Sequence, residues 1–206
     1  MLEFDAPNHI YRYDGRVVPS VTQILGEWIL VNGFYVNTYK TKVVIAESAM
    51  KDAADHGTAV HQGVNILLTD HLNWNELHPS LRNPLKEFGR WHIEHGPELV
   101  SIGYKMYSKR YGYAGTPDPF YVLKIGRRYV LCFVEIKSGA HLLAGPQIAA
   151  YIQMYREHSK FKGDVQRWVL ELPKEGAYKF ERCGNRLDWA FFESCLLRRS
   201  YIERLA

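Results

Sequence analysis

The sequence predicts an α/β protein in which a central mixed β-sheet is flanked by helices. Segments of helical periodicity alternate with strand-like segments along the chain, an order typical of this class. Residues 129–134 combine β-branched and aromatic side chains, as expected for a buried strand. Apolar residues make up 47% of the 206 residues, enough to bury a sizeable core, so we expect a single domain over residues 1–206.

The N-terminal part predicts a hairpin, a helix and a loop. Residues 9–18 read as two short strands around Asp14-Gly15, a pair typical of tight hairpin turns. Ser20 is followed three residues later by Gln23, which is the capping-box pattern that starts a helix. Residues 33–42 mix aromatic and polar side chains, which indicates a loop or a flap at a substrate entrance.

The next part predicts two helices and a strand. A long helix is expected over residues 41–68, and an amphipathic helix over residues 85–94 that ends at Gly96-Pro97. Polar residues, with prolines within or just after them, predict a loop over residues 70–83. A strand is expected over residues 98–107.

A hairpin is the central prediction. Residues 115–117, Gly-Thr-Pro, break the chain before Asp118, and Gly126 suits the turn between two strands. The second strand ends in Glu135 and Lys137, which point the same way because alternate residues of a strand share a face. Two adjacent strands would therefore present Asp118, Glu135 and Lys137 at one spot.

The C-terminal part predicts helix, two strands and helix. A helix is expected over residues 146–158, with Pro146 at its first turn. Residues 164–172 and 177–182 read as strands, and a closing helix is expected from about Arg186.

Two crowded carboxylates point to a bound cation. Burying Asp118 beside Glu135 costs free energy unless positive charge compensates. Lys137 can balance one charge, and a hard divalent ion such as Mg²⁺ or Mn²⁺, which prefers oxygen ligands, can balance the rest. The structural alternative is a Glu135–Lys137 ion pair on an edge strand.

Four short motifs resemble those of the PD-(D/E)XK nuclease superfamily, and they follow one another along the chain in the order found in that family. Its signature is matched by Pro117-Asp118 and by Glu135-Ile136-Lys137. Residues 19–25, 57–61 and 147–151 narrow the resemblance to the RecB-type branch, which includes phage exonucleases.

The resemblance implies a restriction-endonuclease-like fold and a set of site residues. The catalytic residues it implies are Asp118, Glu135 and Lys137. The metal ligands it implies are His61, Glu98, Asp118, Glu135 and the Ile136 carbonyl. The residues assigned to substrate binding are Ser138, Gln147 and Tyr151.

Several of these residues also have a structural interpretation. His61 lies on an inward helical face among small and apolar neighbours, as a satisfied core histidine would. Glu98 also suits a surface glutamate beside a helix end. Gln147 and Tyr151, four residues apart on one helical face, also suit a helix with an ordinary buried tyrosine.

We expect from the resemblance a metal-dependent DNA exonuclease that hydrolyses phosphodiester bonds from DNA ends, in phage biology or in DNA recombination and repair. A structure-selective or restriction-like endonuclease is the alternative within the same chemistry. A catalytically silent DNA-binding or assembly protein on the nuclease fold is the alternative from another class. No glycine-rich phosphate loop supports a third candidate, a small-molecule enzyme with a carboxylate–metal site.

Composition restricts the partners. The net charge is only +4, so single- or double-stranded DNA would have to meet a local basic patch. A recombination partner protein and a second copy of the chain are further candidate partners. No apolar run approaches membrane-spanning length and no signal peptide is visible, so we expect no membrane partner and a cytoplasmic location in a bacterium or a phage-infected host.

The cysteines argue against a cluster cofactor. Cys132, Cys183 and Cys195 are three in number and have no C-x-x-C spacing, so neither disulfides nor a zinc ribbon are expected. Some RecB-type nucleases hold an iron–sulfur cluster on four cysteines, and three are too few, so we predict no iron–sulfur cluster. Cys132 is expected to be a small core residue within its strand.

Overall fold

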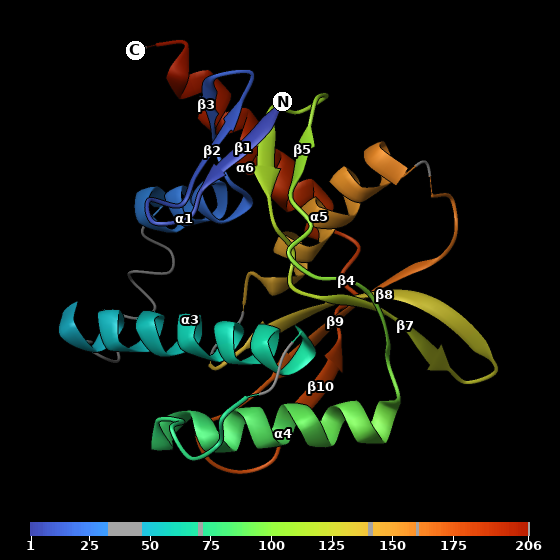
Figure 1. The fold of residues 1–206 in the computed structure, drawn as a ribbon. Coiled ribbons are helices and arrows are strands. Elements are labelled where there is room, and N and C mark those ends of the chain that lie inside the picture. Colours follow the sequence, from blue (N-terminus) through green and yellow to red (C-terminus); the bar gives the residue numbers. More distant parts are fainter. Residues whose placement is uncertain (33–46, 70–71, 140–141, 160, 206) are drawn as a thin grey trace.

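A five-stranded mixed sheet forms the centre of the computed structural model (Figure 1), which describes residues 1–32, 47–69, 72–139, 142–159 and 161–205. Its strand order is β10-β9-β8-β7-β4. β8 and β9 are parallel, and the other neighbouring pairs are antiparallel. The strands are β4 (Glu98–Ser101), β7 (Phe120–Ile125), β8 (Arg128–Lys137), β9 (Val165–Glu171) and β10 (Lys179–Arg182). This confirms the predicted α/β class.

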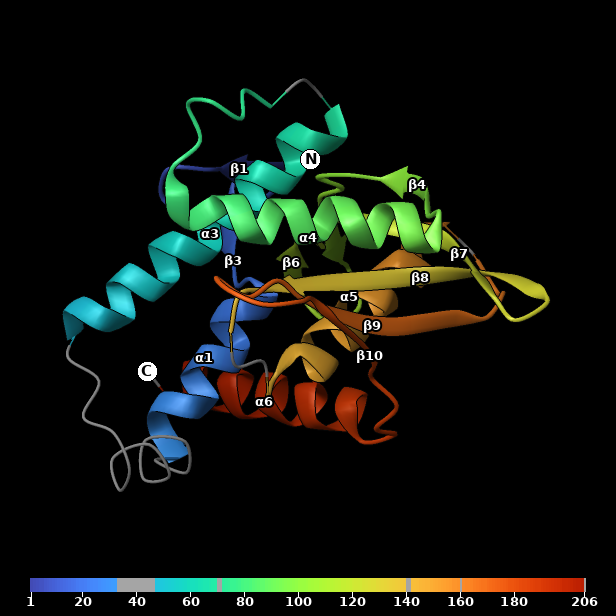
Figure 2. The ribbon, with the colours of Figure 1, turned by 90° about the horizontal axis from the view of Figure 1, so that it is seen from below.

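Helices cover both faces of the sheet, as Figure 2 shows. α3 and α4 lie on one face, and α1, α5 and α6 lie on the other. The helices are α1 (Val21–Asn32), α3 (Glu47–Thr69), α4 (Pro79–His95), α5 (Ala144–Ser159) and α6 (Asp188–Glu203). Each face of the sheet therefore buries its own apolar cluster.

Alternation along β8 divides its side chains between the two clusters. Leu131 and Phe133 pack toward α5 and α6, whereas Cys132, Val134 and Ile136 pack toward α3 and α4. The period of two is the reason, since successive side chains point to opposite faces of a sheet. Cys132 is fully buried in mid-strand, as predicted.

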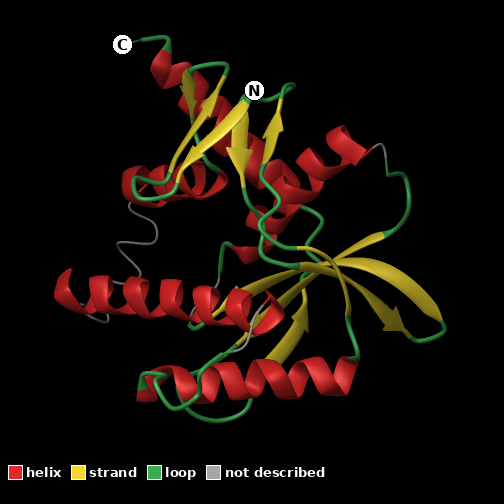
Figure 3. Cartoon of the chain, viewed as in Figure 1, coloured by secondary structure: helices red, strands yellow, loops and turns green. Residues whose placement is uncertain are grey.

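Two small antiparallel sheets stand at one end of the molecule (Figure 3). One contains β1 (Leu2–Asp5), β2 (Ile10–Tyr13) and β3 (Arg16–Val18), and the other contains β5 (Met106–Ser108) and β6 (Tyr113–Gly115). The β2–β3 hairpin confirms the predicted turn at Asp14-Gly15, where both residues have positive φ. β1 was not predicted from the sequence.

The capping box at the start of α1 is confirmed. The Ser20 N–H donates to Gln23 Oε1 at 2.9 Å, and the Gln23 N–H donates to Ser20 Oγ at 3.1 Å. These reciprocal bonds satisfy two backbone donors that the first turn leaves free.

The predicted loop over residues 70–83 was wrong at its end, because α4 begins at Pro79. Proline is tolerated at the first position of a helix, because the backbone N–H of any residue there has no partner within the helix. His78 caps this end by accepting from the Ser80 N–H. The other end of α4 agrees with the prediction, since Gly96 takes the left-handed conformation just after His95.

The single strand predicted over residues 98–107 was also wrong. β4 belongs to the central sheet and β5 to a small sheet, with a turn between them in which Gly103 has a φ of 65°. A positive φ suits glycine, which lacks a Cβ, and it redirects the chain from one sheet to the other.

The remaining predicted elements are present. The β7–β8 hairpin, helix α5, strands β9 and β10, and helix α6 all lie within a few residues of their predicted positions. The predicted loop over residues 33–42 and the predicted start of a helix at residue 41 lie outside the described residues. None of the helices within the described ranges is both long and apolar enough to cross a membrane.

The contact between α3 and α4 depends on a small residue, and this gives a stability prediction. A Cβ on Gly63 would lie 2.7 Å from Leu85 Cδ1, whereas a Cβ on Gly89 of α4 would meet no atom within 4 Å. Gly89→Ala should stabilise the fold by about 1 kcal/mol through helix propensity. Gly63→Ala has the same gain in helix propensity, but its new methyl group would press against Leu85. The Gly63→Ala variant should therefore be less stable than Gly89→Ala by about 1–3 kcal/mol.

Urea unfolding of the two variants and the parent measures this difference. Equal stability of the two variants would show that Leu85 moves aside at no cost, and that α3 and α4 are not closely packed there.

Candidate active site

Four segments that are distant in sequence meet at the C-terminal end of β8. Asp118 lies just before β7, Glu135 and Lys137 end β8, His61 lies on α3, and Gln147 lies on α5. Side-chain hydrogen bonds join His61 to Asp118 and join Glu135, Lys137 and Gln147 to one another, and the Ile136 N–H links Asp118 to β8. The expected convergence of Asp118, Glu135 and Lys137 is thus visible in the geometry.

Both carboxylate oxygens of Asp118 accept hydrogen bonds. Oδ1 lies 2.8 Å from His61 Nδ1, and Oδ2 accepts from the Ile136 N–H at 2.8 Å. Burial disfavours the charged carboxylate, but His61, Lys137 and the Ile136 N–H together hold the pKa of Asp118 below its usual value. Asp118 in turn raises the pKa of His61. The pair is therefore ionic in character.

His61 is not a purely apolar core residue. Its side chain is 32% exposed, and its ring is directed to the Asp118 carboxylate. Since the ionised carboxylate can only accept, Nδ1 carries the proton in this contact.

Glu135 is 3% exposed, and one of its oxygens accepts two hydrogen bonds. Lys137 Nζ and Gln147 Nε2 each lie 2.7 Å from Glu135 Oε1. Burial raises the pKa of Glu135, and the charge of Asp118 raises it further, whereas Lys137 opposes both effects. Burial would lower the pKa of Lys137, but Glu135 and Asp118 hold it above its usual value, so Lys137 remains an ammonium.

Gln147 connects Glu135 to Tyr151. Its Nε2 also donates to Tyr151 Oη at 3.3 Å, and its Oε1 accepts from Lys137 Nζ at 3.3 Å. Gln147 and Tyr151 are buried, and their spacing of four residues places both on the same face of α5. Gln147 is therefore part of a polar network at this position and not a surface residue.

The other predicted residues fall in different places. Ile136 contributes its N–H to the cluster, but its side chain packs in the opposite core. Ser138 is half-buried in the turn after β8 and faces α3, since a Cβ on Gly57 would lie 3.5 Å from Ser138 Oγ. Glu98 is exposed on the edge strand β4, opposite Val122. The structure does not bring Glu98 to the cluster.

Two residues of the neighbourhood were not identified from the sequence. The Tyr11 hydroxyl lies 2.8 Å from Thr116 Oγ1, so β2 holds the segment that leads into Asp118. These residues are 105 positions apart. No local pattern signals a contact of this range.

The donor chemistry of the cluster suits a hard divalent ion. Two carboxylates and one imidazole are ligands that Mg²⁺ or Mn²⁺ accepts. Within the described ranges, however, no three His, Cys, Asp or Glu side chains stand close enough together to form a metal-binding group. The carboxylates are instead compensated by His61 and Lys137, and a bound ion would have to replace part of this compensation.

Comparisons with known proteins add no assignment. No protein-family model matches the chain, and no curated protein matches its sequence.

The Glu135–Lys137 ion pair gives a prediction about stability and pH. Lys137→Met should destabilise the fold at about pH 8 by about 3–5 kcal/mol, because it leaves Glu135 buried near Asp118 without its cation. The pKa of Glu135, already raised, should rise further. The folded variant then binds a proton more readily than the unfolded chain, so its stability should fall as the pH rises from about 4.3, the ordinary glutamate value, through the folded pKa.

Urea unfolding at several pH values tests this prediction. The double variant Lys137→Met/Glu135→Gln should recover most of the loss, because it removes the uncompensated charge. A loss that is independent of pH and is not recovered in the double variant would mean that Lys137 stabilises the fold by packing alone.

Proposed function

We propose that this protein is a metal-dependent DNA nuclease that hydrolyses phosphodiester bonds from DNA ends. One observation carries the proposal: the buried Glu135 and the half-buried Asp118 lie together beside the Lys137 ammonium, at the C-terminal end of a central strand. Burying paired carboxylates is costly, and perturbed groups of this kind concentrate at functional sites. End dependence, and a place in phage recombination or repair, are proposed from the resemblance to the RecB-type branch.

The substrate chemistry explains why both signs of charge are needed. A phosphodiester is anionic, so a water molecule can attack it only where that charge is neutralised and the water is activated. Asp118, Glu135 and His61 do not stand close enough together to hold an ion in the arrangement described, so they would have to draw together around it. A divalent ion held in this way would supply Lewis acidity and lower the pKa of a bound water.

The protein's own residues position and stabilise the reacting groups. Lys137 Nζ has three donors, and among the described residues Glu135 and Gln147 take two of them, which leaves one for a phosphoryl oxygen or the attacking water. Gln147 holds the Glu135 carboxylate in place through Nε2. Asp118 is held by the Ile136 N–H, which fixes it relative to β8. Such preorganised donors and acceptors are what stabilises a developing charge.

Digestion of labelled DNA tests the proposal. Linear and closed-circular DNA, single- and double-stranded, are incubated with Mg²⁺, with Mn²⁺ or with EDTA. We expect loss of linear DNA only, and only with metal. Lys137→Ala and Asp118→Asn should each lower the rate by at least about 100-fold, since each removes a group that acts on the reacting atoms.

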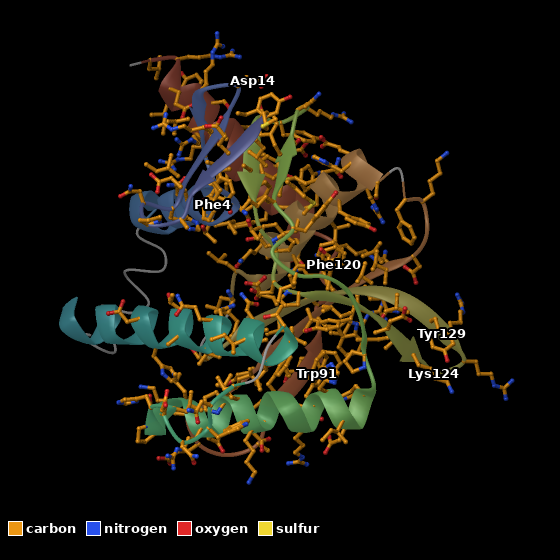
Figure 4. All side chains as sticks on the ribbon, in the orientation of Figure 1. Phe4, Asp14, Trp91, Phe120, Lys124 and Tyr129 are labelled. Carbon is orange, nitrogen blue, oxygen red and sulfur yellow. The ribbon has the colours of Figure 1, made fainter. Side chains whose placement is uncertain are left out.

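Lys124→Ala is the matched control. Lys124 is exposed near the outer end of the β7–β8 hairpin, far along the strands from the cluster (Figure 4), so this variant should keep the parent rate. Cleaved circles would indicate an endonuclease. Retained DNA binding without any cleavage would favour the catalytically silent protein, and near-parent rates of Lys137→Ala or Asp118→Asn would refute this site.

The role of His61 has a separate prediction. His61→Ala should shift the Mn²⁺ concentration for half-maximal activity upward by about 10-fold or more, because it removes both a donor and the partner that orients Asp118. A Mn²⁺ titration of the cleavage rate measures the shift. An unchanged midpoint would limit His61 to a structural contact with Asp118.

A further inference from the structure

A cavity of about 320 Å³ lies beside the candidate active site, between the N-terminal sheet and the segment that leads to Asp118. This volume is at the lower end of the range typical of small-ligand sites. Its walls are mostly apolar, with a few polar groups. The residues that line it are Phe4, Ala6, His9, Tyr11, Ser20, Thr22, Gly103, Lys105, Gly115, Thr116 and Tyr151.

One wall of the cavity is aromatic. The Phe4 ring lies 4.4 Å from the Tyr11 ring and 5.5 Å from the His9 ring, measured between centroids. Tyr11 is buried beneath the other two, whereas Phe4 is half-buried and His9 is exposed. Phe4 and His9 therefore remain accessible for contact with a flat ligand.

The polar groups of the cavity include a cation and hydroxyls. Lys105 is exposed, and its Nζ lies 5.8 Å from the centroid of the Phe4 ring. The hydroxyl-bearing residues Thr22 and Thr116 also line the cavity. An ammonium beside an aromatic face suits a ligand that carries both a planar ring and a negative charge.

The cavity adjoins the carboxylate cluster through a shared wall residue. Tyr151 lines the cavity and also the crevice that contains Asp118 and Glu135. That crevice is too narrow for a water molecule, whereas the adjoining cavity has room for part of a substrate. Thr116, two residues before Asp118, forms part of the cavity wall and bonds to Tyr11.

We propose that this cavity holds an unpaired nucleobase of the DNA strand whose neighbouring phosphodiester lies at Asp118 and Glu135. The base would contact Phe4 and His9, and Lys105 would contact a phosphate of the same strand. A paired base inside a duplex cannot enter such a cavity, so the substrate is single-stranded DNA or a frayed end. This inference rests on the proposed function, because it takes the adjacent cluster as the site of cleavage.

Binding in EDTA, which is separate from cleavage, tests the inference. The probe is a single-stranded oligothymidylate with a fluorescent 2-aminopurine at one end, compared with a fully paired blunt duplex of the same length. Phe4→Leu removes the ring, and Ala6→Phe fills the cavity from an exposed position. Each should weaken single-strand binding by about 5-fold or more, with duplex binding unchanged, since stacking on an aromatic side chain is the contact removed or blocked.

Phe161→Leu is the matched control, because Phe161 is exposed and does not line the cavity. Lys105→Ala should weaken binding less at high salt than at low salt, because it removes a phosphate contact. Melting temperatures close to that of the parent show that each variant is folded.

The outcomes separate the two proposals. Single-strand affinity within about twofold of the parent in both Phe4→Leu and Ala6→Phe would overturn the nucleobase site, even if the parent cleaves DNA. Equal weakening of single-strand and duplex binding would overturn it as well. Loss of single-strand binding in both variants, with a parent that cleaves no DNA, would support the nucleobase site and refute the nuclease.

Discussion

The carboxylates of Asp118 and Glu135 lie together at one end of the central strand β8, and much of the surrounding structure depends on how they are compensated. A carboxylate removed from water is costly unless charge and hydrogen bonds replace its hydration. Asp118 has His61 and the Ile136 N–H, and Glu135 has Lys137 and Gln147. The compensating groups come from α3, β8 and α5, so the position of each of these elements is tied to the charge balance of one site.

The pairing of β8 with β9 helps to explain how α5 reaches this site. Because these strands are parallel, the chain has to cross from the end of one to the start of the other, and α5 forms most of that crossover. Gln147 and Tyr151 lie in the first half of α5, which begins shortly after β8 ends, so they lie near the C-terminal end of β8. Tyr151 packs closely against Gly115, which has no side chain. A Cβ at Gly115 would lie only 2.7 Å from Tyr151 Cε1.

The N-terminal sheet is joined to the segment that carries Asp118 by contacts between distant parts of the chain. The Ala114 N–H donates to the Pro19 carbonyl at 2.9 Å, and Tyr11 bonds to Thr116. The sheet and this segment together enclose the aromatic cavity. A change in the first 20 residues can therefore affect the neighbourhood of the carboxylates, although it is far from them in sequence.

The sequence by itself determined the features that depend on local periodicity and local bonding. The capping box at Ser20, the common face of Glu135 and Lys137, and the shared face of Gln147 and Tyr151 all follow from spacings of two to four residues. The central hairpin likewise followed from its turn residues and its run of β-branched and aromatic side chains.

Only the tertiary structure decided which distant groups meet. It paired His61 with Asp118, joined Tyr11 to Thr116, and left Glu98 on an exposed edge strand away from the cluster. The long-range contacts depend on strand order and on the packing of helices against the sheet, and spacing within a segment carries no information about either.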